Sequence, residues 1–281
     1  MITLAKFLAI SGIILPMLPH KNLIPDINLT PYSIWLATVV VSGISYLSYL
    51  LKRYVFHESG TLVSGIIGGL YSSTATISVL ARKSRKASEQ EATDYVAAML
   101  LAVSMMFLRF MILILIFSRE IFLSIYPYLL TMAVVAAIVA WFIHSRQKRP
   151  EDQPAETEED DSSNPLEFKV ALIFAVLFVI FTFLTHYTLV YAGTGGLNLL
   201  SFVSGFSDIT PFILNLLQNI GSVAALIITA CSMQAIISNI MVNMFYALFF
   251  AGKGSKLRPW ILGGFGVVIA CNLVLLLFFY I

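Results

Sequence analysis

The chain has 281 residues, of which 59% are hydrophobic and 11% are charged, and its formal net charge is +2. A soluble globular domain carries about 25% charged residues, so the composition excludes this class and predicts a polytopic membrane protein. At roughly 20 residues for each spanning helix, the chain has room for about eight or nine membrane segments and none for a soluble catalytic domain.

Long apolar stretches follow one another along the chain without the polar-apolar alternation of strands, so we expect helices. The first stretch resembles a signal peptide, but no small-residue cleavage site follows it. We interpret residues 1–30 as a retained N-terminal membrane helix and a loop. The predicted segments are 3–19, 31–51, 60–81, 95–117, 121–143, 167–192, 196–217, 223–250 and 259–281.

A polar stretch at residues 145–166 divides the later segments into two groups. It begins with basic residues and then holds seven of the fifteen acidic residues of the chain, which predicts a solvated, disordered linker. The groups on either side, 31–144 and 167–281, are the two predicted membrane repeats.

Two of the segments, 60–81 and 196–217, are interrupted in the same way, by glycine followed by hydroxyls or a carboxylate. Interrupted hydrophobic segments at corresponding places in two halves of a chain are typical of the substrate site of a transporter. The alignment pairs Gly69 with Gly205, Leu70 with Phe206, Ser72 with Asp208 and Thr74 with Thr210.

The basic clusters indicate how these segments relate to the membrane, because cytoplasmic loops carry an excess of lysine and arginine. If every segment crossed the membrane, the clusters would fall on both sides. If the two interrupted segments are re-entrant hairpins, all clusters fall on one side, and we therefore predict hairpins with cytoplasmic basic loops. The clusters are Lys52-Arg53, Arg82 to Lys86, Arg146 to Arg149 and Lys253 to Arg258.

The predicted fold class is an all-α polytopic membrane protein with two inverted repeats after one N-terminal helix. Each repeat has three spanning helices and one re-entrant hairpin. Because three crossings are an odd number, the second repeat is inverted relative to the first. Repeats of this kind place a site near the bilayer midplane at their interface.

Arg109 and Asp208 are the charged residues that we expect at this site. Arg109 lies in the middle of its apolar segment, where it is costly unless paired or hydrated, and it either lines a polar cavity or has a structural role. Asp208, followed by Thr210 and Pro211, has the pattern of a helix N-cap. It could also bind a cation, accept a proton or pair with Arg109.

Hydroxyls and amides complete the predicted site. Four hydroxyls follow the hairpin glycines of the first interrupted segment, and two flank Asp208 in the second. Asn239 and Asn243 lie four residues apart on one helix and either line the site or bridge helices. The predicted binding residues are Arg109, Asp208, Ser72, Ser73, Thr74, Thr76, Ser207, Thr210, Asn239 and Asn243, with hairpin glycines Gly68, Gly69 and Gly205.

The sequence holds no Ser-His-Asp set, metalloprotease motif, P-loop or dinucleotide fingerprint. Its two cysteines, Cys231 and Cys271, lie in apolar runs and are expected to be small buried hydrophobic residues. We therefore expect no enzyme, no cofactor and no nucleic-acid partner, whereas metal binding stays open.

The stretch Gly68-Gly-Leu-Tyr-Ser-Ser-Thr-Ala-Thr-Ile-Ser-Val-Leu-Ala-Arg-Lys-Ser-Arg85 resembles the signature of the C-terminal membrane domain, of unknown function, of MgtC/SapB-family proteins. Family members usually carry an MgtC-like membrane domain ahead of this one, so the resemblance implies a stand-alone form or an excerpt. Asn243 stands where the family often has lysine. The resemblance continues at residues 106–109, 164–169, 200–208 and 238–242.

These patterns predict an integral membrane transporter or channel for a small ion or small polar solute, with a midplane site formed by two broken-helix tips. The alternative is a non-transporting membrane subunit that regulates another membrane protein. We expect the protein in the lipid bilayer of a bacterial inner membrane. Further expected partners are a second copy of the chain and an MgtC-like membrane domain.

Overall fold

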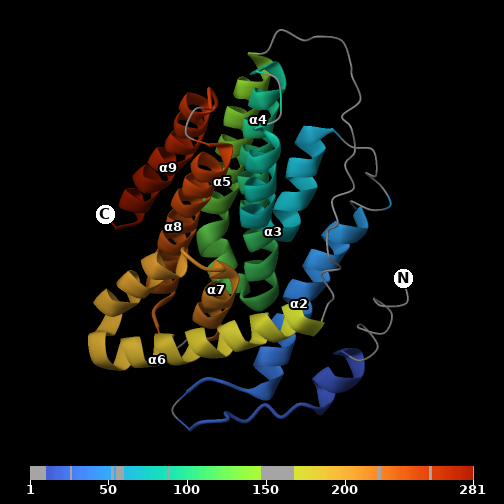
Figure 1. The fold of residues 1–281 in the computed structure, drawn as a ribbon. Helices are drawn as coiled ribbons and strands as arrows, with labels where there is room; N and C mark the ends of the chain where they lie inside the picture. The colour runs from blue at the N-terminus through green and yellow to red at the C-terminus, as the bar shows by residue number, and fades with distance from the viewer. Residues whose placement is uncertain are drawn as a thin grey trace. The chain divides into compact units, whose positions relative to one another are not determined.

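The computed structural model describes residues 11–25, 27–51, 54, 60–85, 87, 89–146, 168–219, 223–252 and 255–280. Within these ranges the chain is helical apart from short connections, among which Ile24 and Ile27 form an isolated antiparallel β-bridge. The long elements are α2 (Pro31–Leu50), α3 (Thr61–Lys83), α4 (Glu89–Phe117), α5 (Arg119–Ser145), α6 (Phe168–Ser204), α7 (Ile209–Gln218), α8 (Ala225–Ala251) and α9 (Arg258–Tyr280) (Figure 1).

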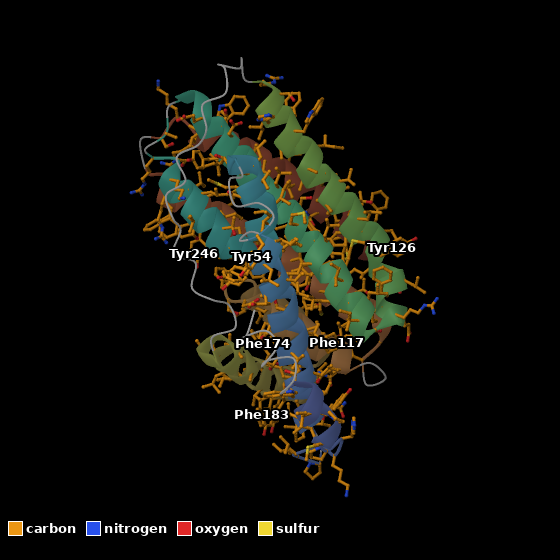
Figure 2. The ribbon with its side chains drawn as sticks, turned by 90° about the vertical axis from the view of Figure 1, so that its right-hand side faces the viewer. Tyr54, Phe117, Tyr126, Phe174, Phe183 and Tyr246 are labelled. Carbon is orange, nitrogen blue, oxygen red and sulfur yellow. The ribbon has the colours of Figure 1, made fainter. Side chains whose placement is uncertain are left out.

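Seven of the described helices, all of these except α7, are long and apolar enough to cross a membrane. The most apolar window lies in α4, with a mean hydropathy of 2.6. Large apolar side chains project outward from the helices, as Tyr126 does in Figure 2. Trp141 has 67% of its surface exposed. Exposed apolar surface of this extent is stable only against lipid or protein, and the protein is a polytopic membrane protein.

The described residues form two compact units. Unit 1 comprises those within Met1–Leu47, Leu113–Phe122 and Ser163–Ser238, and unit 2 those within Ser48–Ile112, Leu123–Ser162 and Asn239–Ile281. Helix α3 therefore belongs to unit 2, whereas α6 and α7 belong to unit 1. The two interrupted segments lie in different units, and each is described within its own.

In unit 2, the first arm of α3 packs backbone to backbone against α4. A Cβ atom placed on Gly65 would lie 2.3 Å from the carbonyl oxygen of Ala98, and one placed on Gly69 would lie 2.5 Å from the Cα of Ala102. Each helix thus presents two small residues four positions apart, the arrangement that lets membrane helices approach most closely.

In unit 1, α6 joins two stretches that the sequence predicts as separate segments, 167–192 and 196–217. The helix changes direction at Gly193, whose φ of 59° and ψ of −151° lie in a region that favours glycine (Figure 1). Its second arm ends at Ser204, and α7 begins at Ile209. The second arm and α7 together make up the predicted interrupted segment.

Several predicted features lie partly or wholly outside the described residues. The predicted first helix over 3–19 is described as helical from residue 11 to residue 17. The linker over 145–166 lies outside, except for its first two residues. So do the basic residues Lys52, Arg53, Lys86, Lys148, Arg149 and Lys253.

Candidate functional site

The break in α3 falls at Ser72, which has an extended backbone with φ −159° and ψ 108°. Its hydroxyl accepts a hydrogen bond from the backbone N–H of Ala75 at 3.3 Å, so Ser72 caps the second arm of the helix. A Cβ atom on Gly68 would lie 2.4 Å from the Thr76 hydroxyl oxygen. In an unbroken helix these residues would be about 12 Å apart along the axis, so the chain bends sharply here and the two arms touch.

Arg109 reaches this break from the neighbouring helix α4. Its guanidinium Nη1 donates to the carbonyl oxygen of Tyr71 at 2.7 Å, and only 8% of the residue is exposed. In an unbroken helix that carbonyl would accept from the Ala75 N–H, which here donates to Ser72 instead. The arginine therefore satisfies a backbone carbonyl that the break has freed.

Asp208 caps the other broken segment, in unit 1. It is extended, with φ −73° and ψ 114°, and its carboxylate accepts from the Thr210 N–H at 2.9 Å. The N-cap interpretation of Asp208 is confirmed. The side chain is exposed, as is Ser207, whereas Thr210 and the rest of the first turn of α7 are buried.

Ser72 and Asp208, which the alignment paired, thus have the same local role. Each is an extended residue after a glycine-containing turn of helix, and each uses a side-chain oxygen to cap the arm that follows. The two breaks share this local geometry, whereas the two inverted repeats stay a prediction. Arg109 lies in unit 2 and Asp208 in unit 1, and their pairing stays a prediction.

The remaining predicted hydroxyls lie close to these breaks. Ser73 is buried and Thr74 is half-buried in the first turn after Ser72, and Thr76 lies against Gly68. On the other segment, the Ser207 hydroxyl donates to the carbonyl of Ser204 at 3.1 Å. This bond back to the preceding turn is the common local role of serine in membrane helices.

Asn239 and Asn243 lie on the part of α8 that belongs to unit 2. The Asn243 amide donates to the side-chain oxygen of Asn239 at 3.1 Å, and both residues are buried, Asn243 completely. The carboxamide oxygen of Asn243 accepts no hydrogen bond from the described residues. A buried acceptor left in this state costs about 1–3 kcal/mol, so this position is suited to a polar ligand.

Other buried polar contacts were not predicted from the sequence. In unit 1, the Ser201 hydroxyl donates to the side-chain oxygen of Gln234 at 2.7 Å, and the Cys231 thiol lies 3.4 Å from that of Asn198. Asn198 and Ser201 are three residues apart, which places both on one face of a helix. This spacing is the signal from which the sequence could have indicated a polar contact with α8. Cys231 is buried as expected, whereas Cys271 is only half-buried.

In unit 2, His144 Nδ1 lies 2.6 Å from the carboxylate of Asp94, and the Tyr128 hydroxyl donates to the buried Asn272 at 2.5 Å. Neither pairing was expected from the sequence. Among the residues that the structure describes, no group of three or more His, Cys, Asp or Glu side chains is placed to hold a metal ion.

Comparison with known proteins places both breaks inside one family domain. An uncharacterized protein of Aquifex aeolicus (strain VF5) is 24% identical over 227 residues, which cover 79% of this chain and 96% of that protein. No solved structure matches the chain. Residues 39–251, well over half of the chain, match the family described as "Domain of unknown function (DUF4010)", and the chain belongs to this family.

Proposed function

We propose that the protein is a transporter or channel for a small ion or a small polar solute. The observation that carries the proposal is the buried guanidinium of Arg109, held at 2.7 Å on the Tyr71 carbonyl where α3 is broken. A buried charge within an apolar membrane helix is costly and typically belongs to an ion or substrate pathway. Irregular backbone at membrane depth is tolerated where it is buried in protein or lines a cavity.

The second broken segment supports the same function. Transporters commonly bind their substrates at the N-termini of half-helices, and Asp208 stands at such an N-terminus, exposed in front of the buried α7. We infer from the repeat pattern that both breaks serve one transport pathway. The binding residues that we propose are the ten polar residues predicted above, together with the hairpin glycines Gly68, Gly69 and Gly205. Of these glycines, Gly68 lets the two arms of α3 touch, and Gly69 lets α3 pack on α4.

In unit 2, the charges favour an anion or a solute rich in acceptor groups. Arg109 supplies a positive charge, and the N-terminus of the second α3 arm, which starts after Ser72, adds the positive end of a helix dipole. Asn243 adds a buried carboxamide whose oxygen accepts no hydrogen bond from the described residues and can accept one from a donor group of a solute. The carboxylate of Asp208 is then available to carry a coupling proton or cation.

The proposal is tested by flux of a solute panel into proteoliposomes that contain the purified protein, with protein-free liposomes as the control. The panel holds chloride, phosphate, small carboxylates, monovalent cations and Mg²⁺. We expect flux above the control for one chemical class, with anions the strongest candidates because of Arg109. If no solute moves, the transport proposal fails, and the alternative of a non-transporting regulatory subunit takes its place.

Asp208→Asn tests the second break. Asparagine is as good an N-cap as aspartate, so α7 should keep its start and the unfolding temperature should change little. If the carboxylate carries a coupling ion, flux should fall to a few per cent of the wild-type rate or lose its dependence on an ion gradient. Full, gradient-dependent flux in the variant would remove Asp208 from the pathway.

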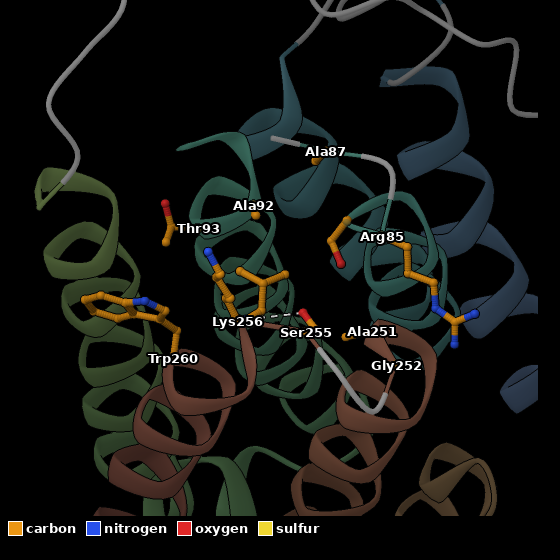
Figure 3. Close-up of a pocket in the computed structure, with 11 residues that line it drawn as sticks. Arg85, Ala87, Ala92, Thr93, Ala251, Gly252, Ser255, Lys256 and Trp260 are labelled. Atoms are coloured by element: carbon orange, nitrogen blue, oxygen red, sulfur yellow. Dashed lines mark hydrogen bonds between the residues drawn. The ribbon is translucent and has the colours of Figure 1, made fainter. Parts of the chain in front are cut away.

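One further observation supports the predicted membrane orientation. Arg85 and Lys256, from two different basic clusters, line the same pocket of unit 2 (Figure 3), which supports their predicted location on one side of the membrane. Single cysteines in place of Ala87 and Lys256 should both react with an impermeant maleimide only from the cytoplasmic side. Labelling of the two positions from opposite sides would overturn this topology.

The resemblance to MgtC/SapB-family proteins supports two finer proposals. The chain works in a bacterial inner membrane, and it associates with an MgtC-like membrane domain or with a second copy of itself. We propose no enzymatic step, because the described polar residues are arranged as helix caps and interhelical hydrogen bonds.

A further inference from the structure

A group of buried polar side chains lies in unit 1, where the short helix α7 packs on the first arm of α6 (Figure 1). The ring centroids of Phe212 in α7 and Phe181 in α6 are 5.7 Å apart, and the Asn215 amide donates to the Thr182 hydroxyl at 2.7 Å. Every residue of α7 from Ile209 to Leu217 is buried, although the helix is too short to cross a membrane. The polar contact between the two helices therefore lies in the interior of the unit.

The hydrogen bonds of Thr182 fix the direction in which the Asn215 carboxamide points. The Thr182 hydroxyl donates its only hydrogen to the carbonyl oxygen of Phe178 at 2.8 Å, so toward Asn215 it can only accept. Asn215 must therefore turn its NH2 group toward Thr182 and its carboxamide oxygen elsewhere. Asn215 is completely buried, and this oxygen accepts no hydrogen bond from the described residues.

Two further buried oxygens on the same two helices have no partner among the residues that the structure describes. One is the hydroxyl oxygen of Thr185, a residue that is 1% exposed and lies one turn after Thr182. Threonines in membrane helices often bond back to their own carbonyls, as Thr182 does, and Thr185 departs from this pattern. The other is the side-chain oxygen of Gln218, one turn after Asn215. Residues three apart share a helix face, so both oxygens flank the contact between Thr182 and Asn215.

The electrostatics of this place favour a cation. The open groups are neutral oxygens, and α7 ends beside them at Gln218. The C-terminus of a helix carries a partial negative charge, and the C-terminal ends of half-helices coordinate Na⁺ in transporters. Asn219 caps α7 by donating to the carbonyls of Asn215 and Leu216. The attraction to a cation therefore comes from the dipole of the helix and from the open side-chain oxygens.

We propose that Asn215, Thr185 and Gln218 bind a monovalent metal cation, Na⁺ or K⁺, and that Thr182 positions Asn215. Hydroxyl and carboxamide oxygens suit hard cations, whereas Mg²⁺ and Ca²⁺ usually require carboxylates, of which these side chains offer none. A buried water molecule would also be held by such oxygens, but it has two hydrogens for three open acceptors. A cation is attracted to all three. The site is distinct from Asp208, which caps the other end of α7, and its occupancy does not depend on transport.

The test is the unfolding temperature of the purified protein in detergent, titrated with NaCl or KCl. Choline chloride keeps the ionic strength constant. A cation that binds only the folded state raises the unfolding temperature saturably, and we expect this rise with one of the two metal cations. Equilibrium dialysis with ²²Na⁺, or with ⁸⁶Rb⁺ in place of K⁺, should then give one cation per chain. Equal unfolding temperatures in all three salts would overturn the proposal and assign the open oxygens to buried water.

Thr185→Val removes one proposed ligand and keeps the shape of the side chain. It should weaken the binding of the cation about tenfold or more. The unfolding temperature in choline chloride should not fall, because the hydroxyl that is lost has no partner among the described residues. The matched control is Thr38→Val in α2 of the same unit, which removes a buried hydroxyl that donates to the Ile34 carbonyl at 2.8 Å. Wild-type affinity in Thr185→Val, or equal weakening in both variants, would contradict the site.

Asn215→Leu removes the central oxygen at nearly constant volume. We expect the variant to lose the response to the cation and to unfold in choline chloride at the wild-type temperature or above, since a buried open acceptor is gone. A purely structural role of Asn215 predicts the reverse, a lower unfolding temperature with an intact response. If the variant does not fold, Gln218→Met carries the same test, with severalfold weaker binding expected and unchanged binding counting against the site.

The positioning role of Thr182 is tested by a pair of substitutions. Thr182→Val removes the oxygen that accepts from the Asn215 amide, so the carboxamide loses its fixed direction and the cation should bind severalfold more weakly. Thr182→Ser keeps the hydroxyl and should restore the affinity of the wild type. If Thr182→Val binds the cation as tightly as Thr182→Ser, Thr182 does not position Asn215.

Discussion

Replacing Arg109 with alanine is expected to abolish solute flux in proteoliposomes. The substitution removes the buried positive charge and also the donor that satisfies the Tyr71 carbonyl at 2.7 Å. A carbonyl left unsatisfied in a buried position costs about 1–3 kcal/mol, so the arms of α3 should also lose their defined geometry. The measurement is initial flux of the transported solute, normalised to the protein incorporated in each preparation.

Arg109→Gln separates the charge from the hydrogen bond. Glutamine carries no charge but keeps an amide donor. This donor is two bonds closer to the backbone than Arg109 Nη1 and reaches the Tyr71 carbonyl only if the helices shift slightly, so the variant should recover part of the unfolding temperature and none of the flux. Arg119→Ala is the matched control, because it removes an exposed arginine at the start of α5. Wild-type flux in Arg109→Gln would mean that the arginine has a purely structural role, and the proposed pathway would then lose its main support.

The features that the sequence predicted correctly are those with local causes. Asp208 could be identified as an N-cap because aspartate is a preferred N-cap residue and Thr210 and Pro211 follow it. The position of Ser72 followed from its alignment with Asp208, whereas its capping role was not predicted. The long apolar helices followed from apolar length alone. Helix α3 is also long and apolar enough to cross a membrane, and its re-entrant course stays a prediction. The depth of Arg109 within its segment was equally readable, since it depends only on the residues that flank it.

The contacts of these residues could not be predicted in the same way. Arg109 and Tyr71 are 38 positions apart, and they meet only because α3 packs closely against α4. The same holds for Tyr128 with Asn272, which are 144 positions apart. Such pairs depend on helix packing, for which hydrophobic periodicity in a membrane helix gives little direction because most faces are apolar.

The course of α6 shows a different limit. The stretch Gly193-Thr-Gly-Gly196 is consistent with a loop between two helices, as the sequence analysis expected, or with a bend inside one. The structure has the bend, because Gly193 alone adopts a positive φ of 59° and the residues after it return to helix. A Cβ atom on Gly193 would meet nothing within 4 Å, so its backbone conformation, and not crowding, requires glycine there.

Gly69→Ala is expected to destabilise the protein far more than a glycine-to-alanine change at a position where the added Cβ meets open space. The new Cβ would lie 2.5 Å from the Cα and 2.6 Å from the carbonyl oxygen of Ala102. These are backbone atoms, so no change of rotamer can relieve the contact, and the first arm of α3 must move away from α4. Overpacking of this kind costs about 1–3 kcal/mol, and Gly69→Leu should prevent folding altogether.

Gly266→Ala is the matched control, since Gly266 lies inside α9 with nothing within 4 Å of an added Cβ. It should be neutral or stabilising, because alanine is favoured over glycine in helices by about 1 kcal/mol. Unfolding temperatures in detergent, measured side by side, give the comparison. Similar unfolding temperatures for the two variants would contradict the close packing of α3 on α4.

Ala102→Gly should not rescue Gly69→Ala, because the crowding is with the main chain of Ala102 and not with its methyl group. Gly69 is also only two residues from Tyr71, so an arm pushed away from α4 carries the Tyr71 carbonyl away from Arg109. We therefore expect the fraction of Gly69→Ala that still folds to transport more slowly than the wild type. If the folded fraction transported at the wild-type rate, the contact between Arg109 and the break would not be required for function, even though the packing argument would stand.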